Sequence, residues 1–93
     1  MRTIEWSTAF KRDYKRESKS RSRAEVDKLI MPVFKALAAD QPLNDRYRDH
    51  QLTGSWCGYR ECHVKPDLLL IYRMVGKEEL RLARLGSHSK LFG

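Results

Sequence analysis

Three histidines are the side chains of this sequence best suited to acid–base chemistry. His50 and His63 flank a turn in the stretch YRDHQLTGSWCGYRECHVKPD, and His88 lies in the tail LGSHSKLFG. Histidine exchanges protons near neutral pH because its ordinary pKa is about 6.5. Metal-free cleavage of RNA needs such groups: a base for the 2′-hydroxyl, an acid for the leaving 5′-oxygen, and a cation beside the phosphorane.

Charged and aromatic residues that could complete such a site lie near the ends of the predicted strands. Asp67 lies in a turn and Arg84 on the last strand, while Trp56, Tyr59 and Phe92 could stack on unpaired bases. Taken alone, a loop histidine is usually solvated, and an aspartate of this kind usually serves the turn. Residue types alone therefore permit catalysis and equally permit a protein that only binds RNA.

Two cysteines beside a histidine have the spacing of a metal-ligand cluster. On a strand, however, successive side chains point to opposite faces, so Glu61 and His63 share one face while Arg60 and Cys62 share the other. A structural zinc site needs four converging ligands, and no second cysteine pair is present. We therefore predict no metal ion and no other cofactor, with Cys57 and Cys62 as reduced thiols in a cytoplasmic protein.

Size and charge limit the class of protein. The chain has 93 residues and a formal net charge of +7, from 19 Lys and Arg against 12 Asp and Glu. Without an internal repeat or a linker, residues 1–93 are predicted to form one domain. An excess of positive charge attracts polyanions, nucleic acid above all. No signal peptide or membrane-spanning run is apparent, so we expect no membrane partner.

A first helix is predicted from Thr8 to about Lys19. Ser7 is suited to cap it, because its hydroxyl can accept a hydrogen bond from a free amide of the first turn. Its outer surface carries five basic residues, among them Lys11 and Lys15. Their density, with few acidic residues between them, favours contact with a polyanion.

A second helix is predicted to begin at Ser22. The segment Ser22–Glu25 fits a capping box, and apolar residues then recur at helical spacing as far as Leu37. Pro32 interrupts this stripe. Inside a helix proline deletes one hydrogen bond and clashes with the preceding turn, so we expect a kink or two shorter helices.

The second half of the chain reads as strands. A period of two appears from Tyr47 onward and predicts strands at Gly58–Val64, Leu68–Met74 and Glu79–Leu85, while Arg2–Trp6 could form a short opening strand. The middle run, Leu68–Met74, is apolar on both faces, as in a strand covered on both sides. The predicted fold is α+β, with a short N-terminal strand and two helices packed on one face of an antiparallel β-meander.

A long motif runs from Asp49 to Phe92, about half of the chain. It reads DHQLTGSWCGYRECHVKPDLLLIYR, followed by ELRLARLGSHSKLF. The pattern D-H-x-L-x-G-x-W-x-G-Y-R-x-x-H-V-x-P-D, then L-I-Y, then R-x-G-x-H and a near-terminal Phe, resembles the YafQ branch of the RelE superfamily. These proteins are the toxins of bacterial type II toxin–antitoxin pairs. The N-terminal half is similar only in its strand–helix–helix layout.

The resemblance implies a ribosome-dependent endoribonuclease that enters the vacant A site and cuts the mRNA codon there. The implied reaction is metal-independent attack by the 2′-hydroxyl, which leaves a cyclic or 3′-phosphate and a 5′-hydroxyl. Matched position by position, His50, His63, Asp67 and His88 fall on catalytic positions. We assign His50 and His63 as the acid–base pair, Asp67 as the residue that orients one of them or holds its proton, and His88 as a third proton-handling or phosphate-binding group.

A second set of residues is assigned to phosphate or RNA. Arg84 matches a basic position that would stabilise the phosphate, Phe92 matches the terminal aromatic residue, and Glu61 falls at a position usually held by an acidic residue. The residues assigned to binding phosphate or RNA are Arg84, Arg60, Glu61, Phe92, Lys11 and Lys15.

The same resemblance implies partners. A free toxin would arrest translation, so we expect a small antitoxin with a DNA-binding N-terminal half and an acidic, flexible C-terminal half that folds on binding. An acidic segment suits a surface of net charge +7, because charge complementarity speeds association. The ribosome and its mRNA are the other expected partners, and operator DNA is expected only through the antitoxin complex.

Three alternative functions stay open at this stage. The chain could be a basic RNA- or ribosome-binding module without catalysis, although such a binder needs no acid–base set. It could be a DNA-binding repressor component, although no helix-turn-helix is apparent. It could also be an inactivated member of the family, against which the presence of His50, His63, Asp67 and His88 argues.

Overall fold

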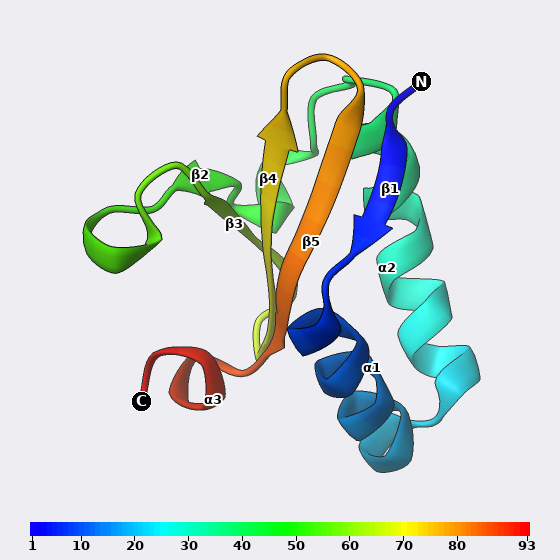
Figure 1. Ribbon diagram of the computed structural model, residues 1–93. Helices are drawn as coiled ribbons and strands as arrows, with labels where there is room; N and C mark the ends of the chain where they lie inside the picture. The colour runs from blue at the N-terminus through cyan, green and yellow to red at the C-terminus, as the bar shows by residue number, and fades with distance from the viewer.

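A computed structural model describes residues 1–93. In chain order the elements are β1 (Thr3–Trp6), α1 (Thr8–Arg21), α2 (Arg23–Ala38), the short 3-10 helix η1 (Asp45–Tyr47), β2 (His50–Gln51), a second 3-10 helix η2 (Gly54–Trp56), β3 (Arg60–Lys65), β4 (Leu68–Val75), β5 (Glu79–Gly86) and α3 (His88–Phe92) (Figure 1). None of these helices is long and apolar enough to cross a lipid bilayer.

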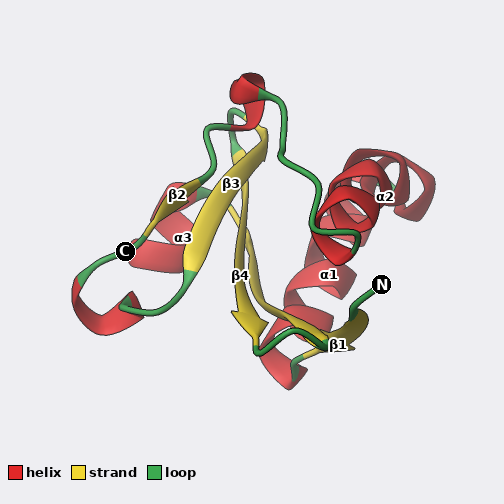
Figure 2. Cartoon of the chain, turned by 90° about the horizontal axis from the view of Figure 1, so that it is seen from above, coloured by secondary structure: helices red, strands yellow, loops and turns green.

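The strands form one mixed sheet in the order β1-β5-β4-β3-β2. Strands β2 to β5 pair antiparallel with their neighbours, while β1 pairs parallel to β5 at the edge. The predicted α+β fold is therefore confirmed, with the antiparallel meander extended by one parallel strand. Helices α1 and α2 lie on one side of the sheet and α3 on the other, which is seen most easily from above (Figure 2).

Local capping explains where the two long helices begin. The Ser7 hydroxyl accepts a hydrogen bond from the Phe10 amide at 3.0 Å, and the Ser22 hydroxyl accepts one from the Glu25 amide at 3.2 Å, as predicted. Helix α2 continues through Pro32 as one helix, so the expected division into two shorter helices is wrong. Its buried stripe packs against the sheet on both sides of the proline, which offsets the lost hydrogen bond.

The central strand β4 is buried on both faces, as its sequence predicts. Leu68, Leu70 and Tyr72 belong to the large core beneath α1 and α2, while Leu69 and Ile71 pack on the opposite face. That second face is covered by Leu91 of α3. This helix was not predicted from the sequence, because five residues are too few to show a periodic apolar pattern.

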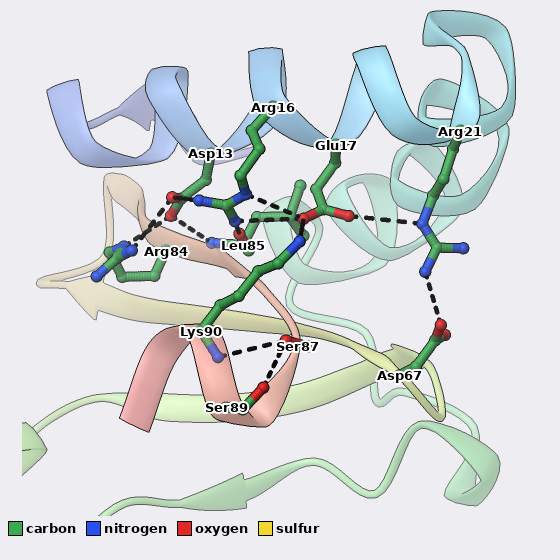
Figure 3. Close-up of polar contacts among 10 residues, drawn as sticks. All are labelled: Asp13, Arg16, Glu17, Arg21, Asp67, Arg84, Leu85, Ser87, Ser89 and Lys90. Carbon is green, nitrogen blue, oxygen red and sulfur yellow. Dashed lines mark hydrogen bonds and ion pairs between the residues drawn. The ribbon is translucent and has the colours of Figure 1, made fainter. Parts of the chain in front are cut away.

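Side chains of α1 complete the edge of β5 where β1 has ended. Strand β1 pairs only with Glu79–Leu82. Beyond it, the Asp13 carboxylate accepts a hydrogen bond from the Leu85 amide at 2.9 Å, and Arg16 donates to the Leu85 carbonyl at 2.8 Å (Figure 3). Unpaired backbone groups at a sheet edge cost stability when they are buried. The helix therefore substitutes for the missing length of strand.

Asp13 is the centre of this contact. Its carboxylate is 2 % exposed, and it also accepts hydrogen bonds from Arg84 at 2.6 Å and from Arg16 at 2.8 Å. Burial alone would raise the pKa of Asp13, but the bonds from Arg84, the Leu85 amide and Arg16 outweigh it, so the pKa lies below its ordinary value. The ionised carboxylate is thus the form that the fold stabilises.

Replacement of Asp13 by Asn should lower the free energy of unfolding by about 2 kcal/mol at neutral pH, because it leaves the Arg84 guanidinium without its counter-charge. The depressed pKa adds stability that is present above the unfolded-state value of about 3.9 and is lost as the pH falls through the folded-state value. Urea unfolding of both proteins along an acid series should therefore show the difference shrinking below about pH 4.

The matched control is Asp67→Asn. The Asp67 side chain is 71 % exposed and pairs with Arg21, so its loss should change stability by less than about 1 kcal/mol. Equal losses for the two variants, or a difference for Asp13→Asn that stays constant through the acid range, would contradict the role given to the buried carboxylate.

Candidate active site

Strand register brings two histidines to one carboxylate. His50 of β2 stands opposite Glu61 of β3, and His63 lies two residues further along the same face. The Oε1 atom of Glu61 is 3.5 Å from His50 Nε2 and 3.4 Å from His63 Nε2, and the two imidazole rings are 6.4 Å apart. The predicted acid–base pair therefore lies together, with Glu61 between its members.

The Glu61 carboxylate is buried, with 5 % of the residue exposed, whereas the His50 side chain is 50 % exposed and that of His63 is 26 % exposed. A buried carboxylate is stable only with hydrogen-bond or charge partners. Here it can pair with whichever histidine carries the extra proton. The assignment of Glu61 to phosphate or RNA stays a prediction, and what the structure shows is a buried carboxylate that approaches both imidazoles.

A backbone contact fixes which nitrogen of His50 is protonated. His50 Nδ1 lies 2.7 Å from the carbonyl oxygen of Arg48. Since a carbonyl oxygen only accepts, Nδ1 is the nitrogen that carries the proton in this arrangement. Neutral His50 then has Nε2 free to accept a proton. That is the state required of a general base.

A cleft of about 490 Å³ adjoins this pair. It is lined by His50 and Glu61 from the sheet, by His88 and Phe92 from α3, and by the loop residues Leu52, Thr53, Ser55 and Trp56. The rings of His88 and Phe92 lie 4.9 Å apart, and both residues are exposed to solvent. Three residues predicted from distant parts of the sequence, His50, His88 and Phe92, thus meet in one cleft. His63 lies next to it, on the other side of Glu61.

The position of α3 depends on its contacts with α1. Lys90 lies 3.4 Å from the Glu17 carboxylate, and Ser87 caps the helix by accepting from the Lys90 amide at 3.3 Å (Figure 3). A Cβ atom at Gly86 would lie 2.7 Å from Nη2 of Arg16 and 3.2 Å from Leu91. A side chain at this glycine of the R-x-G-x-H pattern would displace the Arg16 guanidinium, which donates to the Leu85 carbonyl, and would crowd Leu91 of α3.

Asp67 has a different partner from the one predicted. Its carboxylate lies in the turn between β3 and β4 and forms an ion pair with Arg21 at 2.9 Å (Figure 3). Arg21 reaches this turn because the end of α1 lies above it, and it also approaches Glu17 at 3.6 Å. The structure thus gives Asp67 a contact to the helix layer, and its assignment as the residue that orients His50 or His63 or holds a proton stays a prediction.

The two arginines assigned to phosphate are held by carboxylates. Arg84 bonds to Asp13, and Arg60 bonds to Asp49 at 2.8 Å while Tyr72 donates a hydrogen bond to the same carboxylate. These bonds raise the pKa of both guanidinium groups. Arg60 also lies on the face of β3 opposite to Glu61. Both arginines thus pair with carboxylates of this chain, and their assignment to phosphate or RNA stays a prediction.

The two lysines assigned to RNA lie on the outer surface of α1. Lys11 and Lys15 are exposed, and Lys15 borders a shallow pocket with Lys19 and Arg23 near the junction of α1 and α2. This pocket is separate from the cleft that holds His50 and His88. The lysines are available to a polyanion, but they do not contribute to the cleft.

Sequence reasoning missed two groups of residues around the site. The loop residues Thr53 and Ser55 gave no signal, because they are unspecified positions of the motif, and Leu52 was matched in the motif without being assigned to the site. Asp13 and Glu17 could have been found, since they are acidic residues at i and i+4 within an otherwise basic helix. That spacing places both carboxylates on one helix face, which is the face that meets β5 and α3.

The cysteines differ in environment. Cys62 is fully buried in the core beneath the helices, facing away from His63, and its burial, together with the charges of Asp49 and Glu61, raises the pKa of the thiol. Cys57 is exposed after η2, and both cysteines are free thiols. Cys57, Cys62 and His63 therefore point in different directions, as strand alternation predicts.

Iodoacetamide should label the native protein at Cys57 alone, because alkylation requires an accessible thiolate. Cys62 should react only after unfolding, which intact-mass measurement before and after addition of urea would show as one adduct and then two. In the control Cys57→Ser, the native protein should stay unlabelled. Rapid labelling of Cys62 in that folded variant would contradict the buried position.

The chain is similar to known proteins over nearly its whole length. The family described as "Bacterial toxin of type II toxin-antitoxin system, YafQ" matches residues 2–93. The mRNA interferase toxin YafQ of Escherichia coli K12 is 40 % identical over 92 residues, which covers 99 % of this chain and 97 % of the relative. A protein named putative toxin YafQ from Haemophilus influenzae is 34 % identical over 90 residues, covering 94 % and 88 % of the two chains.

Solved structures show the same fold. A metal-bound toxin from Helicobacter pylori is 47 % identical, with a TM-score of 0.89 and coverage of 99 % of this chain and 100 % of that chain. A chain of the E. coli DinJ–YafQ complex is 37 % identical, with a TM-score of 0.85 and full coverage of both chains. The fold is thus RelE-like, and the chain belongs to the YafQ family of toxins from type II toxin–antitoxin systems.

Proposed function

We propose that this protein is a ribosome-dependent mRNA endoribonuclease, the toxin of a type II toxin–antitoxin pair, which cuts mRNA in the ribosomal A site. The relatives named mRNA interferase support the class of reaction. The observation that carries the proposal is the meeting of His50, Glu61, His88 and Phe92 at one cleft, with His63 on the far side of Glu61. Its action on ribosomes would place it in the cytoplasm.

In the proposed reaction His50 is the base. Its unprotonated Nε2 takes the proton of the 2′-hydroxyl, the 2′-oxygen forms a bond to phosphorus, and the bond from phosphorus to the 5′-oxygen breaks. Protonated His63, oriented by Glu61, gives its proton to the leaving 5′-oxygen. The products are a cyclic phosphate and a 5′-hydroxyl, and no metal ion enters these steps.

The remaining cleft residues bind the RNA. With Arg84 held by Asp13, protonated His88 is the cation that we assign to the phosphate. Phe92 and Trp56 offer aromatic surfaces on which unpaired bases can stack. No arginine lines this cleft, so the site is incompletely organised for phosphorane charge. The ribosome would supply the missing alignment of the mRNA, which is the physical reason for ribosome dependence.

The cleavage assay uses ribosomes programmed with a defined mRNA, with free RNA alongside, and both new ends are mapped. Wild-type protein should cut within the A-site codon and leave a 5′-hydroxyl end. His50→Ala and His63→Ala should each lower the rate by at least about a hundredfold, since positioned proton transfer contributes that much or more. Lys77→Ala, on the exposed β4–β5 turn, is the control and should cut at the wild-type rate.

Two outcomes would change this assignment. Cutting within tenfold of wild type by either histidine variant would show that the pair is wrongly assigned. The absence of any cut on ribosomes or free RNA, with the protein folded, would favour a non-catalytic RNA- or ribosome-binding module. Because solved relatives include a metal-bound toxin, each reaction is run with and without a chelator selective for transition metals, in excess Mg²⁺ so that the ribosomes stay intact. Loss of cutting on chelation would overturn the metal-independent mechanism.

We also propose an antitoxin partner with an acidic, flexible C-terminal half and a DNA-binding N-terminal half, through which the complex would reach operator DNA. The support is the relative solved as a DinJ–YafQ complex and the net charge of +7. The association rate with the cognate antitoxin should fall as salt rises, with a smaller change in the dissociation rate. Stopped-flow mixing measures both, and an association rate independent of ionic strength would count against electrostatic steering.

A further inference from the structure

Besides the cleft, a groove of about 790 Å³ lies between α2 and β3. Four basic residues that have no part in the proposed reaction line it. Lys28 comes from α2, Arg46 and Arg48 from η1 and the residue after it, and Lys65 from the end of β3. All four are exposed, and no acidic residue lines the groove. His63 lies in its wall.

These four cations are free of ion pairs. The arginines that might have met a phosphate elsewhere are held by carboxylates: Arg84 by Asp13, Arg60 by Asp49 and Arg21 by Asp67 and Glu17. None of the groove's basic residues has a carboxylate within 4.0 Å. Unpaired charges of one sign along a concave surface raise the local potential and attract a polymer of the opposite sign.

The groove and the cleft lie next to each other at the contact between His63 and Glu61. His63 lines the groove, and its Nε2 lies 3.4 Å from Glu61, which lines the cleft. Arg48 contributes its side chain to the groove, while its carbonyl oxygen accepts from His50 Nδ1. The segment that orients His50 therefore also carries part of the positive charge of the groove. If an RNA chain has one phosphate in the cleft, its neighbouring phosphates can reach the basic residues of the groove.

An aromatic ring is present among these charges. Tyr47 lines the groove, and the Arg46 guanidinium lies 4.8 Å from the centre of its ring while donating a hydrogen bond to its hydroxyl at 2.9 Å. Cationic side chains interleaved with an aromatic residue are typical of surfaces that bind single-stranded nucleic acid. An acidic peptide would also bind these cations, but its binding would not require the groove to lie next to the reacting histidines.

We propose that this basic groove, formed by Lys28, Arg46, Arg48 and Lys65, binds the backbone of single-stranded RNA next to the cleavage cleft, on the side of His63. The inference deepens the proposed endoribonuclease function and rests on it. It assigns the binding of RNA beyond the cut to these four residues, in place of Arg60 and Arg84.

The test measures binding without cleavage. A 2′-O-methyl oligoribonucleotide cannot be cut, because its attacking hydroxyl is blocked, and fluorescence anisotropy gives its affinity over a series of salt concentrations. The variant Lys28→Gln/Lys65→Gln removes one charge from each wall of the groove. This variant should bind the oligonucleotide on the order of tenfold more weakly near 0.1 M salt. The plot of the logarithm of the association constant against the logarithm of the salt concentration should become less steep by about 1.4, or about 0.7 for each lost contact.

The matched control is Lys35→Gln/Lys77→Gln, which removes the same charge from exposed positions outside the groove. It should bind more tightly than the groove variant and keep most of the wild-type slope. Equal losses in the two variants would show that binding is diffuse and would overturn the proposal. Wild-type RNA affinity in the groove variant, with a loss of affinity for polyglutamate, would overturn it too and assign the groove to an acidic protein partner.

This experiment separates the groove from the chemistry. If wild-type protein fails to cut programmed ribosomes, the proposed function fails, whatever the oligonucleotide does. If it cuts and the groove variant binds the oligonucleotide like the control, only the groove is wrong. Both variants are first compared with wild type by thermal unfolding, and the exposed lysines should leave the midpoint unchanged.

Discussion

The carboxylate of Asp13 joins helix α1 to strand β5, which no regular hydrogen-bond ladder connects. Strand β1 ends halfway along β5, and Asp13 takes up the Leu85 amide where the strand partner is missing. It also holds Arg84, and Arg16 beside it reaches the Leu85 carbonyl. The end of β5 therefore keeps its position against α1, and the chain leaves it in a fixed direction toward α3.

The shape of the cleft depends on this contact between α1 and the end of β5. Gly86 lies close to the Arg16 guanidinium and to Leu91, and α3 then places His88 and Phe92 in the same cleft as His50. The other side of the cleft is built differently, by the short pairing of β2 with β3 that sets His50 against Glu61. A helix–strand ion pair and a two-residue strand together position the residues to which we assign chemistry, so loss of either would separate them without altering their identity.

The positive charge of the chain is divided between two uses. Arg16, Arg21, Arg60 and Arg84 each meet a carboxylate, and those pairs connect the helices, the turns and the sheet. The basic residues of the groove beside His63 meet none. A buried or half-buried guanidinium needs its partner to offset desolvation, whereas exposed cations at a concave surface are stable alone and remain available to a polyanion.

The sequence by itself determined the features that depend on neighbours along the chain. Hydroxyl caps at Ser7 and Ser22, the two-sided burial of β4 and the opposite orientation of Cys62 and His63 all follow from local geometry. The motif resemblance pointed to the family and to four residues that line the cleft, His50, Glu61, His88 and Phe92. Only the tertiary structure decided which charges pair. Arg84 and Asp13 are 71 residues apart, and Arg21 and Asp67 are 46 apart. Such an ion pair forms because packing brings opposite charges together, and a periodic pattern in the sequence does not show which distant residues become neighbours.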